Sequence, residues 1–150
     1  MEAENTAEAG ERLVFNNPEP IIDVVTGDNA DFVSIARTPT ASVQEATIKT
    51  NGGGDGVVVF ARNNAEIAID TGDGGDFVAT RTGFDAEITI DTGKGADTVD
   101  VFGARTEVRV SGGPGNDDIT VDDFFPARGD SSVDAGPGDD SVKFIAGTTT

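Results

Sequence analysis

The chain has 150 residues, which is the length of one ordinary domain, and its 28 acidic against 10 basic side chains give a formal charge of −18. This charge argues against nucleic acid as a partner, and the absence of cysteine excludes disulfides and thiolate metal sites. Only 36% of the residues are apolar, so a conventional core would be thin, and such acidity favours disorder unless cations neutralise it.

Residues 1–20 contain five glutamates and lack the basic start and apolar stretch of a cleavable secretion signal. We predict an acidic leader and N-terminal cap here, in which Leu13–Phe15 covers the first coil of the domain that follows. No apolar run elsewhere is long enough to cross a bilayer, so we expect no membrane insertion. If the chain is secreted, it needs another export route.

Residues 21–150 contain a repeat of about 21 residues. An acidic, glycine-rich loop of the form G-x-G-x-D-x-V, or a close variant of it, recurs six times along the chain. One aspartate anchors each loop, and successive anchors are 24, 21, 21, 20 and 23 residues apart. The anchors are Asp31, Asp55, Asp76, Asp97, Asp117 and Asp140.

The segments between the loops alternate apolar and polar residues, as strands do. Once the loops are aligned, the apolar residues fall into columns. The columns after the loops are Val33, Val57, Val78, Val99, Ile119, Val142 and Ile35, Val59, Thr80, Val101, Val121, Phe144. The columns before the loops are Val24, Ile48, Ile69, Ile90, Val110, Val133 and Ile22, Ala46, Ile67, Ile88, Val108, Ser131. We predict an all-β, right-handed parallel β-solenoid of about six coils with two short strands each. A row of antiparallel hairpins, as in a sandwich or propeller, is the alternative.

Stacked coils would place the six aspartates in one column, with successive carboxylates about 4.8 Å apart. Such neighbours repel by about 0.9 kcal/mol even at the dielectric of water, so a cation is expected between them. Glycines let each loop turn its carbonyls toward one point, which completes an all-oxygen cage. Calcium accepts six to eight oxygen ligands, whereas magnesium tends to keep its water, so Ca²⁺ is the expected ion. A plain tight turn, in which Gly, Asp and Asn are common, is the alternative.

The loops resemble the nonapeptide G-G-x-G-x-D-x-U-x of the RTX family, the calcium-binding β-roll of secreted bacterial proteins. The stretch GGPGNDDIT at 112–120 matches every marked position. TGDGGDFVA at 71–79, TGKGADTVD at 92–100 and AGPGDDSVK at 135–143 lack only the first glycine. The chain departs from the family in two ways: Asn29 and Asn51 replace glycines in the first two loops, and one edge alone carries the motif.

The resemblance implies about three to five Ca²⁺ ions between successive loops, each held by two stacked aspartates and by loop carbonyls. The gaps flanked by Asp76, Asp97, Asp117 and Asp140 match the motif best. The implied carbonyl ligands belong to Gly72, Asp73, Gly74, Gly93, Lys94, Gly95, Gly113, Pro114, Gly115, Gly136, Pro137 and Gly138. The resemblance also implies export without an N-terminal signal and folding that depends on extracellular calcium.

The edge opposite the loops carries one arginine per coil beside a column of acids. We expect a series of surface ion pairs, each worth about 0–1 kcal/mol. A binding edge for sulfated or carboxylated glycans is the alternative. The arginines are Arg37, Arg62, Arg81, Arg105 and Arg128, and the acids are Glu45, Glu66, Glu87, Glu107 and Asp130.

Two further features lie beside the loops. Asp70, Asp91 and Asp134 each precede a loop, where they could extend the metal shell but are expected to cap turns as Asx residues. The insertion at 122–130 carries Phe124 and Phe125, which could close an end of the rod or contact a partner.

The chain offers little for catalysis, because it has no His, Cys or Tyr and its acids belong to the repeat. We therefore expect no enzyme, but a calcium-binding structural or interaction module of a secreted or surface bacterial protein. Its partner would be a surface glycan or another domain. An ice-binding or glycan-binding adhesin solenoid and a fragment of a polysaccharide-acting β-helix enzyme are the alternatives. A salt-adapted cytoplasm is the competing explanation of the acidity.

Overall fold

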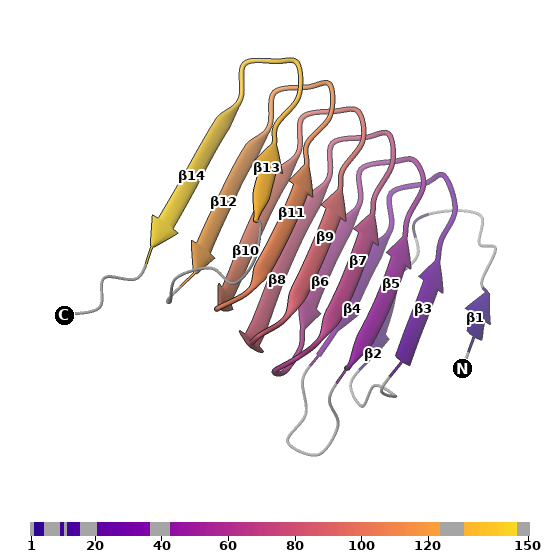
Figure 1. Cartoon of the computed structure of the whole chain (residues 1–150). Coiled ribbons are helices and arrows are strands. Elements are labelled where there is room, and N and C mark those ends of the chain that lie inside the picture. The colour runs from indigo at the N-terminus through magenta and orange to yellow at the C-terminus, as the bar shows by residue number, and fades with distance from the viewer. Residues whose placement is uncertain are drawn as a thin grey trace.

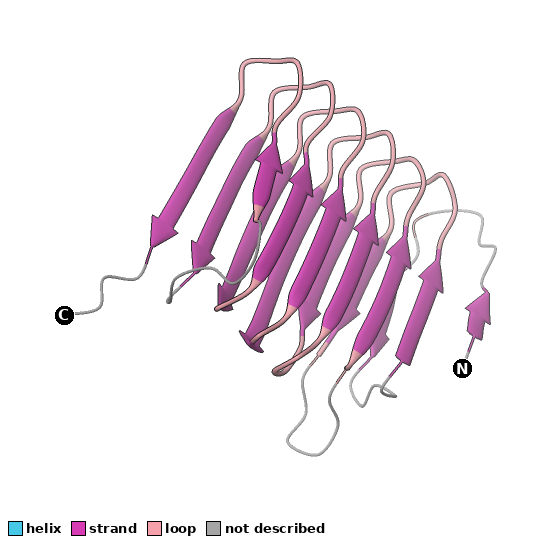
Figure 2. Cartoon of the chain, viewed as in Figure 1, coloured by secondary structure: helices cyan, strands magenta, loops and turns pink. Residues whose placement is uncertain are grey.

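The computed structural model describes residues 2–4, 10, 12–15, 21–36, 43–123 and 131–146. These residues form fourteen strands and no helix, joined by loops at one edge and by turns at the other (Figures 1 and 2). No helix long and apolar enough to span a membrane occurs in this described part of the chain.

The strands form two parallel sheets that face each other along a rod (Figure 1). Sheet A contains β1 (Glu2–Glu4), β3 (Ile21–Val25), β5 (Glu45–Lys49), β7 (Glu66–Asp70), β9 (Glu87–Asp91), β11 (Glu107–Ser111) and β13 (Ser132–Asp134). Sheet B contains β2 (Arg12–Phe15), β4 (Phe32–Ile35), β6 (Gly56–Phe60), β8 (Phe77–Phe84), β10 (Thr98–Ala104), β12 (Asp118–Asp123) and β14 (Ser141–Ala146).

Every described strand pairs with the strand one coil away, never with its neighbour in sequence. The register follows the repeat: Ile67 of β7 lies opposite Ile88 of β9, and Val78 of β8 lies opposite Val99 of β10. The predicted parallel β-solenoid is therefore confirmed, and the alternative of antiparallel hairpins is wrong. From β3 to β13 the chain completes five full turns.

The core consists mainly of the predicted inward columns, with Val43, Ala61, Ala65 and Ala86 added at the turns. β7 and β9 both alternate between exposed and buried residues along their whole length, as a strand with one buried face does. In the central coils the inward valines and isoleucines are almost fully buried; Val78, Val99 and Ile88 are 0% exposed. Identical or similar β-branched side chains thus stack on one another from coil to coil, which favours the in-register parallel pairing.

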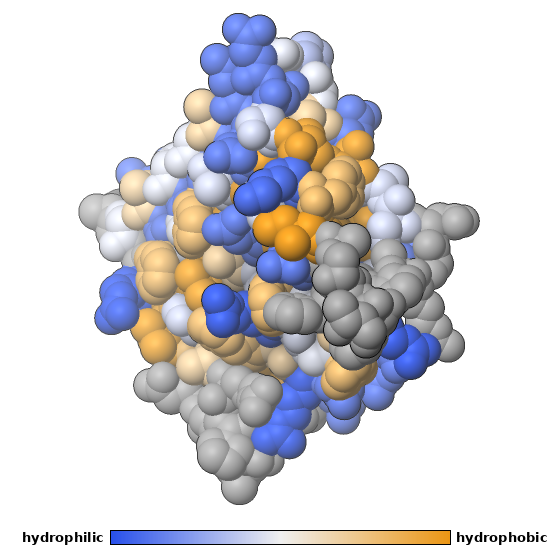
Figure 3. All heavy atoms as spheres, turned by 90° about the vertical axis from the view of Figure 1, so that its left-hand side faces the viewer, coloured by the Kyte–Doolittle hydropathy of each residue, from blue (hydrophilic) through white to orange (hydrophobic). Residues whose placement is uncertain are grey.

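The columns become exposed at the C-terminal end of the rod. Val142 and Phe144 of β14 belong to inward columns, yet they are 43% and 63% exposed, and Ser131 is exposed as well. Figure 3 looks onto this end and shows hydrophobic surface between hydrophilic atoms. At the other end Leu13 and Phe15 of β2 pack against the core, in register with Val33 and Ile35 of β4. The remainder of the predicted leader and cap lies mostly outside the described residues.

Among the described arginines, Arg81 and Arg105 depart from the expected series of ion pairs along the opposite edge. Arg81 lies on β8, where its guanidinium carbon is 5.1 Å from the centroid of the Phe102 ring. Arg105 pairs with Asp85 at 3.5 Å. Two acids of the sheet A column, Glu87 and Glu107, pair instead with Arg109 on the same face of the sheet. Arg37, Arg128, Asp130, Phe124 and Phe125 lie outside the described residues.

Candidate metal centre

The six repeated loops all lie at one edge of the rod and stack along it (Figure 1). Each loop carries the chain from sheet A to sheet B. The loops span 26–31, 50–55, 71–76, 92–97, 112–117 and 135–140. The predicted site residues are therefore brought together in one row, although they are more than a hundred residues apart in the sequence at the extremes.

Glycines make this close stacking possible. Gly93 has a φ of 79°, a left-handed conformation that side chains strongly disfavour. Asn51 takes the equivalent conformation in the second loop, with a φ of 68°, which Asn tolerates better than most residues. At Gly95 the reason is space, because a Cβ there would overlap the carbonyl oxygen of Gly74 in the preceding loop.

Hydrogen bonds connect each loop to the next. Gly95 N–H donates to the carbonyl oxygen of Pro114 at 3.0 Å, and Gly115 N–H donates to that of Pro137, also at 3.0 Å. The carbonyls of Asp73 and Lys94 accept the equivalent bonds in the loops before. Each of these four predicted carbonyl ligands thus uses one lone pair for a hydrogen bond between loops and keeps the other for a cation.

The six anchoring aspartates form a continuous series that we call the aspartate ladder. In each step a backbone N–H donates to the carboxylate one coil further on: Asp55 to Asp76 and Asp76 to Asp97 at 2.8 Å, Asp97 to Asp117 at 2.9 Å. The first and last steps, from Asp31 and to Asp140, measure 2.7 and 3.0 Å. Oδ1 of each accepting carboxylate is satisfied in this way.

The second carboxylate oxygen is not satisfied. Asp55, Asp76, Asp97 and Asp117 are between 2% and 3% exposed, and the Oδ2 atom of each is buried without a hydrogen-bond partner. A buried carboxylate that lacks a partner is costly, so it tends to bind a proton or a cation. Burial accordingly raises the pKa of Asp76 to about 6, and the neighbouring carboxylates of Asp55 and Asp97 add to this rise. Hydrogen bonds from the Asp55 N–H and the Thr71 hydroxyl act in the opposite direction and lower the pKa.

A column of buried threonines, which sequence reasoning missed, lies beside the aspartate ladder. The hydroxyls of Thr50 and Thr71 donate to the carbonyl oxygens of Thr71 and Thr92, at 3.2 and 3.3 Å. The same hydroxyls lower the pKa of Asp55 and Asp76. Because a hydroxyl carries one hydrogen, it cannot donate to the carbonyl and the carboxylate at once. The column could have been predicted from the threonine that recurs at the first position of the nonapeptide, where the RTX motif has glycine.

Two of the three aspartates just before the loops act as caps. Oδ1 of Asp91 accepts the N–H of Gly93 at 3.3 Å, and Oδ1 of Asp134 accepts that of Gly136 at 3.1 Å. These are Asx-type contacts two residues along the chain, so the capping prediction is confirmed at both positions. Asp70 instead lies 3.9 Å from Lys49.

The donor set fits a hard cation that binds oxygen. It consists of carboxylate and carbonyl oxygens in stacked loops, with no nitrogen or sulfur donor. Among the described residues no group of three or more acidic, His or Cys side chains could hold a metal on its own. A cation here would therefore depend on two neighbouring rungs of the aspartate ladder together with loop carbonyls, the ligand set that the RTX resemblance implies.

Comparisons with family models, curated proteins and solved structures give no match.

Proposed function

We propose that this chain is a calcium-binding structural or interaction module, in which cations between successive loops stabilise the β-solenoid. The buried, unpartnered Oδ2 atoms of Asp55, Asp76, Asp97 and Asp117 carry this proposal. Four such oxygens in one row are more than a loop needs for its own hydrogen bonds. They are the feature that separates a cation site from a plain tight turn.

Two neutralising partners compete for these carboxylates. Protons stabilise the aspartate ladder in acid, since the pKa of Asp76 is raised to about 6. Near pH 7 the proton is largely lost from such a group, and stacked charges are left in a buried row. A divalent cation neutralises two neighbouring rungs together, so it is the better partner at neutral pH.

Calcium suits the loops better than magnesium. Loop carbonyls such as that of Lys94 keep one lone pair while they connect the coils, and peptide carbonyls are regular Ca²⁺ ligands. Magnesium demands near-ideal octahedral geometry and gives up its water reluctantly. The residues that would hold the ions are the flanking aspartates and the carbonyls of the glycine-rich loops between them.

The proposed setting is outside the cell or at its surface. Sites built from few carboxylates and many carbonyls bind calcium weakly, with dissociation constants of about 10⁻⁴–10⁻³ M in extracellular modules. Such sites fill in calcium-rich surroundings and stay empty where calcium is scarce. The module would then become rigid only after export, which agrees with the RTX-like motifs.

The test is a calcium titration of chelator-treated protein, followed by circular dichroism and calorimetry. We expect calcium to increase the β-sheet signal and thermal stability, with about three to five ions bound, and magnesium to act far more weakly. Asp97→Asn should reduce the number of bound ions by about two, because Asp97 flanks two gaps between loops. Glu66→Gln, an exposed single-charge control on sheet A, should leave the number unchanged. Absence of any calcium effect, or equal binding by wild type and Asp97→Asn, would refute the proposal.

A further inference from the structure

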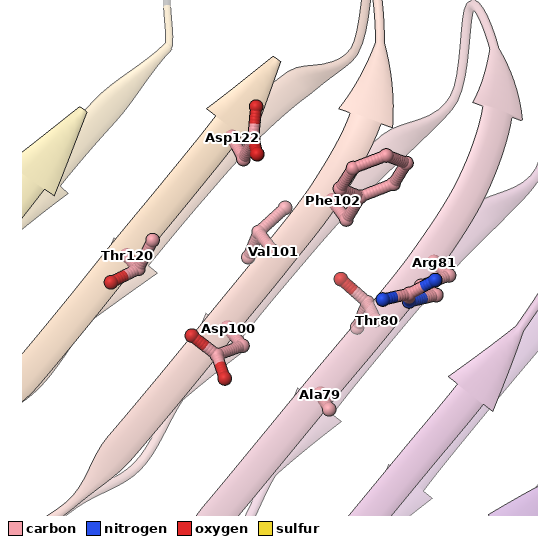
Figure 4. Close-up of a pocket in the computed structure, with 8 residues that line it drawn as sticks. All are labelled: Ala79, Thr80, Arg81, Asp100, Val101, Phe102, Thr120 and Asp122. Carbon is pink, nitrogen blue, oxygen red and sulfur yellow. The ribbon is translucent and has the colours of Figure 1, made fainter. Parts of the chain in front are cut away.

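The outer face of sheet B contains a hollow of about 250 Å³ that lies across three coils. Its wall and floor come from β8, β10 and β12 (Figure 4). In the strand register Ala79, Asp100 and Thr120 form one outward row. Arg81, Phe102 and Asp122 form the next row.

The hollow exists because one residue of the first row is small. Ala79 lies between Val58 of β6 and Asp100 of β10 in the same outward row. Its methyl group is smaller than either neighbouring side chain, so the surface is hollow at this position. Phe102 rises beside this space (Figure 4). The surface is thus a small apolar floor with an aromatic wall.

The polar side chains around the hollow do not satisfy one another. The Arg81 guanidinium stacks on Phe102, a cation–π contact, and within the described part of the chain it forms no ion pair. The described residues likewise give no side-chain partner to Asp100, Thr120 or Asp122.

Elsewhere on the rod, neighbouring opposite charges do pair. Arg109 contacts Glu87 at 2.9 Å, and Lys94 contacts Asp73 at 2.8 Å. Both pairs also join adjacent coils. The hollow is therefore distinct in presenting two carboxylates, a hydroxyl and a guanidinium that all remain available to a ligand.

We propose that this hollow binds a neutral saccharide unit. Sugar hydroxyls both donate and accept hydrogen bonds, so they can serve the carboxylates of Asp100 and Asp122 as acceptors and Arg81 as a donor. The C–H groups of a sugar ring can pack against the ring of Phe102 and the methyl of Ala79. A space of about 250 Å³ is below the usual size of a site for a whole drug-sized ligand, so it suits one ring of a longer chain.

Charge decides against an anionic glycan. The chain carries a formal charge of −18, and the hollow is lined by two carboxylates, of Asp100 and Asp122, against the single guanidinium of Arg81. Both the negative charge of the whole chain and the excess of carboxylates in the hollow therefore repel sulfated or carboxylated chains. Arg81 itself lies on the face of sheet B and not on the edge where the sequence-based alternative of a charged-glycan site placed it.

The test measures binding of cellohexaose, maltohexaose and mannohexaose, with hexagalacturonate as the anionic comparison. Calorimetry and ¹⁵N-resolved NMR on the full, calcium-saturated chain suit a protein without Trp or Tyr. We expect at least one neutral oligosaccharide to bind with a dissociation constant of about 1 mM or tighter, given the few atoms in contact. Amide shifts should concentrate on β8, β10 and β12.

Asp122→Asn should weaken this binding about tenfold, since it replaces charge-assisted hydrogen bonds to the sugar with weaker neutral ones. Phe102→Ala should weaken it about tenfold or more, since it removes the aromatic wall. Asp118→Asn is the matched control, an exposed aspartate on the same strand outside the hollow, and should bind like wild type. Unchanged circular dichroism shows that each variant is folded. No neutral binding up to about 10 mM, equal binding by Asp122→Asn and wild type, or binding of hexagalacturonate alone would overturn the proposal.

Discussion

The backbone N–H of Asp76 donates a 2.8 Å hydrogen bond to Oδ1 of Asp97, one coil further along the rod. Each rung of the aspartate ladder therefore uses one carboxylate oxygen for a coil-to-coil contact and leaves the other buried and unpartnered. The hydrogen bond needs only an acceptor, whereas the second oxygen carries a charge without compensation. These two roles can be separated by substitution.

Asp97→Asn should stabilise the calcium-free protein. The amide oxygen can accept the Asp76 N–H as before, while the amide NH₂ replaces the buried, charged Oδ2 with a neutral donor. A neutral amide costs less to bury than an uncompensated carboxylate charge, so the gain should be about 1–3 kcal/mol. Urea denaturation in chelator at pH 7.5 measures the gain, and Glu66→Gln corrects for the loss of one negative charge. A loss of stability in Asp97→Asn would show that Oδ2 is well satisfied in the metal-free protein.

The calcium-free protein should lose stability as the pH rises from about 4 to about 7. Burial raises the pKa of Asp76 from 3.8 to about 6, so the folded chain binds more protons than the unfolded chain in this range. Stability falls with pH wherever the folded state binds the extra protons. Burial also raises the pKa of Asp55, Asp97 and Asp117, which acts in the same direction.

The measurement is the urea midpoint at pH 5.0 and pH 7.5, with and without calcium. Calcium should reduce the difference, because the cation binds the deprotonated carboxylates and so favours the higher pH. Asp76→Asn should also reduce it in the calcium-free protein. A calcium-free chain that is more stable at pH 7.5 than at pH 5.0 would contradict the raised pKa values.

Much of this arrangement could be predicted from the sequence, because a repeat determines which residues of successive coils pair and which side chains point into the core. The inward columns and the stacked aspartates follow from alignment of the loops, and the glycine at position 95 already indicates a crowded backbone. The N–H bond from each aspartate to the next could not be predicted, since it depends on the distance between stacked backbones. The position of Arg81 was also missed, because alignment on the loops does not show that β8 continues to Phe84 and takes this residue into the sheet.

Gly95→Ala should be strongly destabilising, whereas Gly75→Ala should not be. A Cβ at Gly95 would overlap the Gly74 carbonyl oxygen, so the stacked loops would have to separate. At Gly75 the nearest atom to a new Cβ is the Ala96 carbonyl oxygen at 3.5 Å, an ordinary contact, and the next loop already carries an alanine at this position. We expect Gly95→Ala to cost about 3 kcal/mol or more, and Gly75→Ala to change stability by less than about 1 kcal/mol. Thermal denaturation in calcium compares the two, and equal effects would contradict the close approach of the loops.

Thr71→Val tests whether the threonine column supports the aspartate ladder. Thr71 is 0% exposed, and its hydroxyl donates to the Thr92 carbonyl at 3.3 Å. Valine has the same shape but leaves that carbonyl without this donor, which should cost about 1–2 kcal/mol in thermal or urea denaturation. Because the hydroxyl also lowers the pKa of Asp76, the variant should raise that pKa above its wild-type value in an NMR titration of the calcium-free protein. Thr89→Val, on the exposed face of sheet A, removes the same hydroxyl from a strand and should change neither quantity. If Thr71→Val lowers stability but leaves the pKa of Asp76 unchanged, the hydroxyl serves the carbonyl alone.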